Sequence, residues 1–252
     1  IKALAPDLKI IAPIREYNLT RAEELEYLRK RKVRLPFEVS KTYSIDQNLW
    51  GRSIEGSDLE DPIKEPREEV FEWTVTAEKA PNKAEYMTVG FENGVPKSLN
   101  GTTMEPVALI ETLNKLAGKH GVGRIDHMED RLVGIKSREV YECPGATVIL
   151  EAHKDLEKAV LTRHEILFKQ GVDAEWAFLV YAGLWLEPLK KDLESFIETT
   201  QQRVTGEVKL KIYKGGLRVV GRSSLNSLYD LNLATYGVKT TFDQSLAPGF
   251  IE

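Results

Sequence analysis

Hydroxyl and carboxylate side chains crowd one segment of the sequence that shows no helix or strand periodicity. This segment, YSIDQNLWGRSIEGSDLEDP at residues 43–62, contains Ser44, Ser53 and Glu55. A carboxylate can bind the ammonium group of a free amino acid, and hydroxyl groups can bind its carboxylate. The residue types therefore fit a site for a zwitterion, although serine and glutamate on a loop more often act as solvated capping groups.

A second polar segment, residues 119–146, has three carboxylates close together in the sequence, at Asp126, Glu129 and Asp130. Carboxylates that lie near one another repel, so some of them must face water or a cation. A strand that turns Glu129 inward would let it pair with a ligand ammonium, and the phenol of Tyr141 would add a hydrogen bond. The alternative is a solvent-facing acidic strand beside a half-buried core tyrosine.

The glycine-rich stretches, the single cysteine and the histidines are not expected to do chemistry. GVGR and KGG lack the strand-to-helix context of a phosphate-binding loop. We therefore predict turn glycines at these places, namely Gly121, Gly123, Gly215 and Gly216. Cys143 precedes a proline and is expected to be a small buried apolar residue, not a nucleophile. The four histidines form no HExxH pair, so no catalytic metal site is expected.

Antiparallel hairpins and helices are predicted to position the two polar segments. Asn-Gly pairs after two strand-like runs are typical of hairpin turns, and apolar residues recur at helical spacing elsewhere. The predicted elements are hairpins over 86–101 and 206–220, strand pairs over 124–135, and helices over 107–117, 146–161, 174–186 and 188–203. Residues 35–67 are interrupted by prolines and glycines and are predicted to be irregular.

This order of elements, with helices inserted among antiparallel hairpins, predicts the α+β class. In front of it, LKIIAP at residues 8–13 predicts a strand, and a capping-box pattern predicts a helix over 21–31. We therefore expect a short α/β remnant of one domain at residues 1–36, followed by a larger domain at residues 37–252.

The composition argues against several classes of function. The chain of 252 residues is 42% hydrophobic and 29% charged, which is ordinary for a globular protein. Its 35 basic residues are interspersed with 39 acidic ones and the net charge is -4, so no nucleic-acid partner is expected. No apolar run approaches the roughly 20 residues of a membrane-spanning helix, and a single cysteine agrees with a reducing compartment. We expect a cytoplasmic protein without a membrane partner.

At the same residues the sequence resembles the argininosuccinate synthase family along its whole length. Seven blocks occur in the family's order: ALAPDLKIIAPIRE, YSIDQNLWGRSIEG, LEDP, AGKHGVGRIDHMEDRLVGIKSREVYECPGA, FLVYAGLW, RVTGEVKLKIYKG and SLYDLNL. The resemblance implies that residues 1–36 end a nucleotide-binding α/β domain and that residues 37–252 are a synthetase and multimerisation domain. It also implies citrulline binding by five residues: Ser44, Ser53, Glu55, Glu129 and Tyr141.

The resemblance further implies a carbon-nitrogen ligase of arginine biosynthesis and the urea cycle. The family condenses citrulline with aspartate, and ATP, bound with Mg²⁺, is cleaved to AMP and pyrophosphate through a citrullyl-adenylate. Adenylation turns the poor ureido leaving group into AMP, so the enzyme mainly positions three substrates and shields the activated intermediate from water. No protein nucleophile is needed, and no catalytic residue is assigned.

Parts of the family pattern do not occur in this sequence. The phosphate-binding SGGLDTS loop and the aspartate-binding GNDQ segment stand before its first residue in family members, and a helix that links the subunits of a homotetramer follows its last. The chain alone is therefore expected to bind no cofactor and to be inactive. Two alternatives remain: an oligomerisation scaffold, suggested by the aromatic-rich helices around Trp176 and Trp185, and a citrulline-binding module without catalysis.

Overall fold

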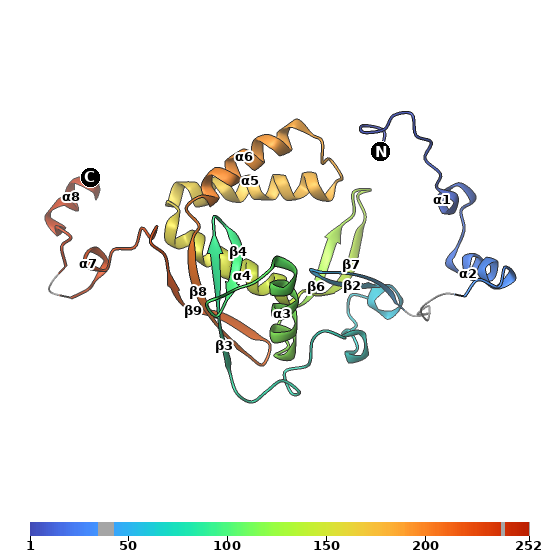
Figure 1. Ribbon diagram of the computed structural model, residues 1–252, viewed down its shortest axis with the longest axis horizontal. Coiled ribbons are helices and arrows are strands. Elements are labelled where there is room, and N and C mark those ends of the chain that lie inside the picture. Colours follow the sequence, from blue (N-terminus) through green and yellow to red (C-terminus); the bar gives the residue numbers. More distant parts are fainter. Residues whose placement is uncertain (35–42, 238–239, 252) are drawn as a thin grey trace. The chain divides into compact units, whose positions relative to one another are not determined.

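The computed structural model describes residues 1–34, 43–237 and 240–251. Contacts divide the chain into two compact units, Ile1–Tyr43 and Ser44–Glu252 (Figure 1). The domain boundary predicted between residues 36 and 37 lies outside the described residues. Within the described ranges, no helix has the length and apolar character needed to cross a membrane.

The described part of the first unit contains two helices, α1 (Pro13–Tyr17) and α2 (Arg21–Lys30). The predicted capping box at the start of α2 is confirmed, because the Thr20 N–H donates to Glu23 Oε2 at 2.7 Å while the Glu23 N–H donates to Thr20 Oγ1 at 3.4 Å. The predicted strand at residues 8–13 is wrong. A strand needs a neighbouring strand for its backbone hydrogen bonds, and the described part of this unit offers none, so Ile11 is left 81% exposed. The α/β character of this unit is therefore not confirmed.

The second unit is an α+β fold with two antiparallel sheets, as the order of elements predicted. One sheet has the strand order β1-β2-β7-β6, formed by β1 (Ser44–Asn48), β2 (Gly51–Glu55), β7 (Lys136–Glu142) and β6 (Arg124–Asp130). The other has the order β5-β4-β3-β8-β9, formed by β5 (Thr102–Thr103), β4 (Val95–Leu99), β3 (Glu85–Glu92), β8 (Gly206–Tyr213) and β9 (Gly216–Ser223). The predicted hairpins over 86–101 and 206–220 are both confirmed.

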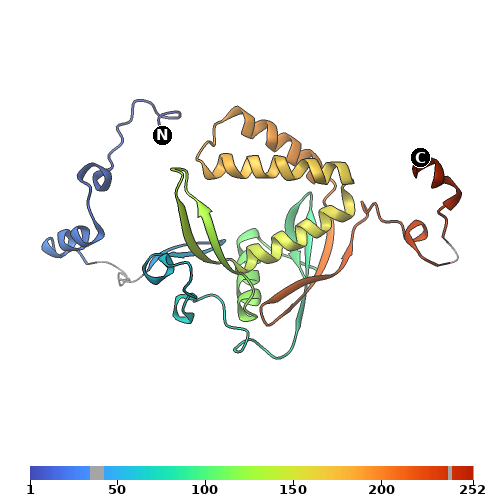
Figure 2. The same ribbon diagram turned by 180° about the vertical axis from the view of Figure 1, so that it is seen from behind.

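Four longer helices accompany the sheets: α3 (Pro106–Lys119), α4 (Pro144–Val160), α5 (Arg163–Tyr181) and α6 (Pro188–Gln201). Helix α4 packs against α3 and against β8 and β9, while α5 and α6 run side by side as a helical hairpin in both views (Figure 1, Figure 2). The remaining elements are short: η1 (Ser57–Glu60), η2 (Glu68–Val70), α7 (Leu231–Ala234), η3 (Gln244–Leu246) and α8 (Pro248–Ile251).

The hydrophobic core lies between the five-stranded sheet and helices α3 and α4. Every fourth residue along one stripe of α4 is completely or almost completely buried, namely Val148, Ala152, Leu156 and Val160. The inward side chains of β8 alternate with outward ones and meet this stripe, namely Val208, Leu210 and Ile212. Burial of each such large apolar side chain contributes about 1.5–3 kcal/mol, so this layer supports the rest of the unit.

Three predictions of element boundaries are wrong. The strand pair predicted over 124–135 extends further, because its second strand, β7, begins only at Lys136. Helix α5 begins at Arg163, eleven residues before the predicted start at residue 174, because a capping box at Thr162 and Glu165 starts it. It also ends at Tyr181, before the predicted residue 186, because Gly183 adopts a left-handed φ of 71°.

Residues 44–55, predicted to be irregular, form the β1–β2 hairpin instead. The local sequence hides this hairpin, because four of the five β1 residues are exposed and one of the two buried β2 positions is Arg52. Strand β2 is held by pairing with β7, in which Arg52 lies opposite Glu142. A partner about 90 residues away leaves no pattern in the strand itself.

Candidate functional site

All five residues assigned to citrulline by resemblance lie on one face of the four-stranded sheet. Ser44 is paired with Glu55, and Ser53 is paired with Tyr141. Glu129 lies four positions along β6 from the residue opposite Tyr141. Directly opposed residues share a face of a sheet, as do residues an even number of positions apart. Two segments far apart in the sequence therefore form one polar surface, which we call the polar face.

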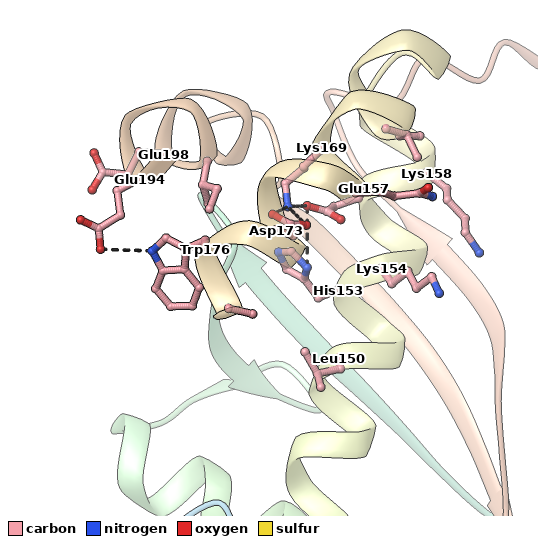
Figure 3. A pocket seen from close by; sticks show the side chains of 14 residues that line it. Leu150, His153, Lys154, Glu157, Lys158, Lys169, Asp173, Trp176, Glu194 and Glu198 are labelled. Atoms are coloured by element: carbon pink, nitrogen blue, oxygen red, sulfur yellow. Dashed lines mark hydrogen bonds and ion pairs between the residues drawn. The ribbon is translucent and has the colours of Figure 1, made fainter. Parts of the chain in front are cut away.

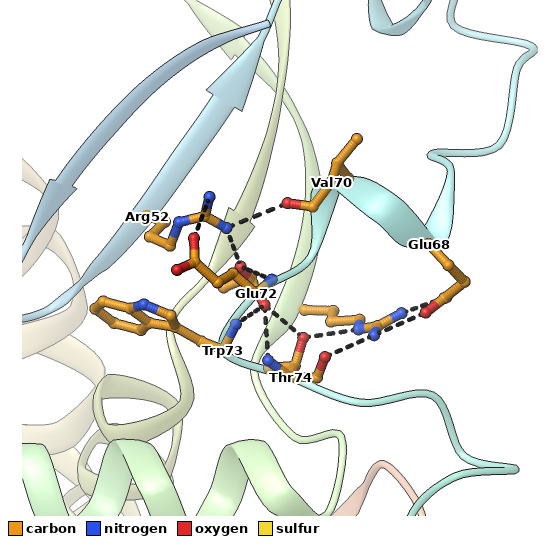
Figure 4. Close-up of polar contacts among 8 residues, drawn as sticks. Arg52, Glu68, Val70, Glu72, Trp73 and Thr74 are labelled. Carbon is orange, nitrogen blue, oxygen red and sulfur yellow. Dashed lines mark hydrogen bonds and ion pairs between the residues drawn. The ribbon is translucent and has the colours of Figure 1, made fainter. Parts of the chain in front are cut away.

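The opposite face of the same sheet is buried around an ion pair. The carboxylate of Glu142, which is fully buried, accepts a hydrogen bond from Arg52 Nη1 at 2.5 Å (Figure 4). It also accepts the backbone N–H groups of Glu72, Trp73 and Thr74 at 3.0, 2.8 and 2.8 Å, and the Thr74 hydroxyl at 2.7 Å. Burial alone raises the pKa of Glu142, but these donors outweigh burial and hold its pKa below the ordinary value.

This buried ion pair fixes the register of the polar face. Arg52 and Glu142 are opposed, and the next opposed pair along the strands is Ser53 and Tyr141. A slip by one residue would turn Ser53 toward the core and Arg52 toward solvent, at the cost of the buried contacts. The interior contact thus determines which side chains meet on the outside.

Tyr141 lies between two carboxylates on the polar face. Its phenol oxygen is 2.7 Å from Glu139 Oε2 and 3.0 Å from Glu129 Oε2. A phenol has one proton and can donate it to only one of them at a time. Burial raises the pKa of Glu139, and the charges of Glu129 and Glu55 raise it further although the phenol lowers it. Burial and both carboxylates likewise raise the pKa of Tyr141. A cationic ligand group would relieve this repulsion.

One arginine partly neutralises the polar face. Arg131 Nη2 lies 3.3 Å from Glu55 Oε2, and its Nε donates to Ser137 Oγ at 3.1 Å. Both ionic partners are partly exposed, so the pair contributes little to stability. Glu129 and Glu139 lie on the same face as Glu55, so the described carboxylates of this face include three glutamates. The excess negative charge favours an ammonium group.

A hollow of about 470 Å³ opens on the polar face. Its lining residues are Ile125, His127, Glu129, Asp130, Tyr141 and Tyr181. The structure therefore brings Glu129 and Tyr141 into one hollow, while Ser44, Ser53 and Glu55 lie on the same face but do not line it. Sequence reasoning missed Glu139 and Tyr181. The alternation of β7 would have placed Glu139 beside Tyr141, but no local signal marks Tyr181, which ends an apolar helical stretch.

A larger hollow of about 560 Å³ lies among α4, α5 and α6 (Figure 3). At its centre the buried ammonium of Lys169 lies 2.7 and 2.8 Å from the two carboxylate oxygens of Asp173 and 3.2 Å from Glu157 Oε1. His153 Nε2 is 2.7 Å from Gln201 Oε1. A buried cation with two carboxylates is electrostatically satisfied, so this network is better explained as a link between α4 and α5 than as a binding site.

Cys143 and the turn glycines do not form a reactive centre. Cys143 is half-buried and not fully buried as predicted. Burial raises the pKa of its thiol, and the charge of Glu142 raises it further, which opposes a thiolate nucleophile. Gly123 has a left-handed φ of 102°, and a Cβ there would lie 2.5 Å from Pro144 Cα. Gly121 and Gly215 also have positive φ, in agreement with turn glycines. The prediction is wrong for Gly216, which is the first residue of β9.

Comparison with known proteins identifies the relatives of the chain. Residues 43–252 match the family described as "Arginosuccinate synthase C-terminal domain". Over 252 residues, the whole chain, it is 59% identical to the protein named argininosuccinate synthase from Pyrococcus furiosus, covering 61% of that protein. It is 53% identical over 249 residues to the argininosuccinate synthase of Rubrobacter xylanophilus, a match that covers 99% of the chain and 61% of that protein. It is 48% identical over 252 residues to the argininosuccinate synthase of Methanococcus maripaludis, a match that covers 100% of the chain and 63% of that protein. The chain spans about three fifths of the length of these relatives.

The fold and the polar face define an α+β protein with a candidate site for a small charged molecule. The chain belongs to the argininosuccinate synthase family, and it matches the C-terminal domain of that family.

Proposed function

We propose that this chain is the citrulline-binding part of an argininosuccinate synthase. In that role it serves a ligase that condenses citrulline with aspartate and converts ATP to AMP and pyrophosphate. The observation that carries the proposal is the shared face of Ser44, Ser53, Glu55, Glu129 and Tyr141, which two segments far apart in the sequence build together.

The chemistry of the polar face suits the two charged ends of citrulline. The ammonium group binds among Glu129, Glu139 and the oxygen of Tyr141, where one carboxylate lacks the phenol proton. The hydroxyl groups of Ser44 and Ser53 donate to the carboxylate end. The sheet orients the ureido group away from its own strands, and the chain supplies position, not a nucleophile.

The activating chemistry belongs to ATP, which cleaves to give AMP as the leaving group. Among the described residues no three His, Cys, Asp or Glu side chains are placed to hold a metal ion. We propose that the 252-residue chain alone does not turn over. A pyrophosphate assay with citrulline, aspartate, ATP and Mg²⁺ should give no release, and turnover by the chain alone would contradict this.

The organisation of the whole enzyme follows the family resemblance. Residues 1–36 are proposed to end the nucleotide-binding domain and residues 37–252 to form the synthetase domain. The enzyme is proposed to be a cytoplasmic homotetramer. The exposed aromatic side chains of the α5–α6 hairpin, among them Phe168 and Trp185, support assembly and also favour the second candidate function, an oligomerisation scaffold. Light scattering that finds only monomer would count against that second function.

Citrulline binding is tested by NMR titration of the chain with L-citrulline. We expect weak binding, with Kd on the order of 1 mM, and shifts centred on Glu129 and Tyr141. Glu129→Gln should weaken binding by about tenfold, because it removes a charged hydrogen-bond partner. Glu151→Gln, an exposed change on α4, is the matched control and should leave Kd unchanged. Wild-type chain without citrulline-induced shifts at the polar face would refute the proposal.

A further inference from the structure

Tyr181 lines the hollow from outside the sheet. The other residues that line the hollow all belong to β6 or β7. The Tyr181 phenol donates a hydrogen bond of 3.0 Å to the backbone carbonyl oxygen of Asp130, the last residue of β6. The C-terminal end of α5 is therefore attached to the end of the β6–β7 hairpin, and the aromatic ring forms a wall of the hollow.

The position of Tyr181 is fixed by the end of its helix. The N–H of Ala182 still bonds to the carbonyl of Phe178, and Gly183 then leaves the helix with its left-handed φ. The backbone of Tyr181 thus occupies the last helical position, and the hydrogen bond to Asp130 holds its phenol. Its side chain is nevertheless 53% exposed, so it retains surface for a ligand.

The chemistry that Tyr181 offers is restricted. Its proton is engaged by the Asp130 carbonyl, which leaves the oxygen lone pairs and the ring face for a ligand. Lone pairs accept from N–H groups, and an aromatic face attracts a cation. Both favour a ligand with nitrogen donors over one that presents a carboxylate.

We infer that Tyr181 is a specificity-determining residue of the citrulline hollow, which contacts the bound amino acid and limits how large that amino acid can be. This inference rests on the proposed function. Among the described residues, Tyr181 is the one in the lining of the hollow that does not come from β6 or β7, so it bounds the hollow on a side that the sheet does not supply. Loss of the ring removes the boundary and should relax selection among amino acids that differ in length.

The test compares two ligands and three variants by NMR titration. The ligands are L-citrulline and its homologue with one additional methylene. Tyr181→Ala should weaken the binding of citrulline by about tenfold and the binding of the homologue by less. The ratio of the two Kd values should therefore shift several-fold. Tyr181→Phe keeps the ring and should retain the wild-type ratio. Phe178→Ala removes an aromatic ring of similar exposure, 51%, one turn earlier on α5, and should change neither Kd.

The outcomes separate the inference from the proposed function. If wild-type chain shows no shifts with citrulline, the proposed function fails and the inference fails with it. If citrulline binds and Glu129→Gln weakens it, but Tyr181→Ala keeps the wild-type ratio, the inference alone is overturned, since a purely structural role lowers both affinities equally. The ring resonances of Tyr181 in the wild-type chain give an independent readout: they should shift with citrulline, and unmoved resonances beside shifted Tyr141 resonances overturn the inference even if Tyr181→Ala fails to fold.

Discussion

Replacement of Glu142 by glutamine should destabilise the fold strongly although the two side chains have almost the same shape. The carboxylate now satisfies Arg52 and four N–H or O–H donors of residues 72–74. A glutamine has one acceptor oxygen, and its amide N–H groups would face donors. Removal of one partner of a buried ion pair costs about 3–5 kcal/mol.

We expect the lower end of that range, about 3 kcal/mol, because Arg52 keeps two other acceptors. Its Nη2 lies 3.0 Å from Glu72 Oε2, and its Nη1 donates to the Val70 carbonyl at 3.2 Å. Urea unfolding followed by circular dichroism at pH 7 measures the loss. Glu151→Gln, which is exposed, is the control and should stay within about 0.5 kcal/mol of wild type.

The same variant also tests the pH dependence. The pKa of Glu142 lies below its ordinary value of 4.5 in the folded chain. Its contribution is therefore fully present above pH 4.5 and is lost as the pH falls through the lowered folded pKa. The difference in unfolding free energy between wild type and Glu142→Gln should shrink in that acid range. A variant within about 1 kcal/mol of wild type at pH 7 would show that the network carries little stability and would refute this reasoning.

Three further changes test the helix cap, the hairpin turn and the polar face. Thr162→Ala removes the N-cap of α5 and should cost about 1 kcal/mol in urea unfolding; an unchanged midpoint would contradict the cap. Gly94→Ala places a Cβ at a φ of 79° in the β3–β4 turn and should cost about 1–2 kcal/mol, seen as a lower Tm; an unchanged Tm would argue against that turn. Tyr141→Phe removes the phenol group whose hydrogen bond lowers the pKa of Glu139. NMR of the carboxyl carbons should therefore record a higher pKa for Glu139 in the variant than in the wild type. An equal or lower pKa would disprove the hydrogen bond between Tyr141 and Glu139.

The sequence predicted correctly those helices and hairpins whose formation depends on residues within the element itself. The Asn93-Gly94 turn specified the β3–β4 hairpin because both residues adopt left-handed φ, at 49° and 79°. The apolar stripe of α4 and the alternation of β8 likewise specified their elements. Where an element depends on a distant partner, prediction failed: β2 is held by β7, and residues 8–13 have no partner strand in the described part of their unit.

The candidate site shows the same division. Residue chemistry alone allowed two interpretations of Glu129 and Tyr141, a ligand site or an acidic surface strand beside a core tyrosine. The family resemblance then assigned both residues to citrulline binding. The structure adds the shared face and the hollow, while binding itself stays a prediction. Glu139 follows from strand alternation only once the register is known. Tyr181 depends on how the end of α5 packs, which no periodicity within the helix encodes.

Helix α5 links the helical layer of the unit to the four-stranded sheet. Its Lys169 is joined to Glu157 of α4, and its Tyr181 is joined to Asp130 of β6. These points are twelve residues apart, about 18 Å along a helix that rises 1.5 Å per residue. Tyr181, which lines the hollow, is consequently carried by the same stiff helix that holds Lys169 in the interior, so the ligand hollow and the interior ion pair are mechanically connected.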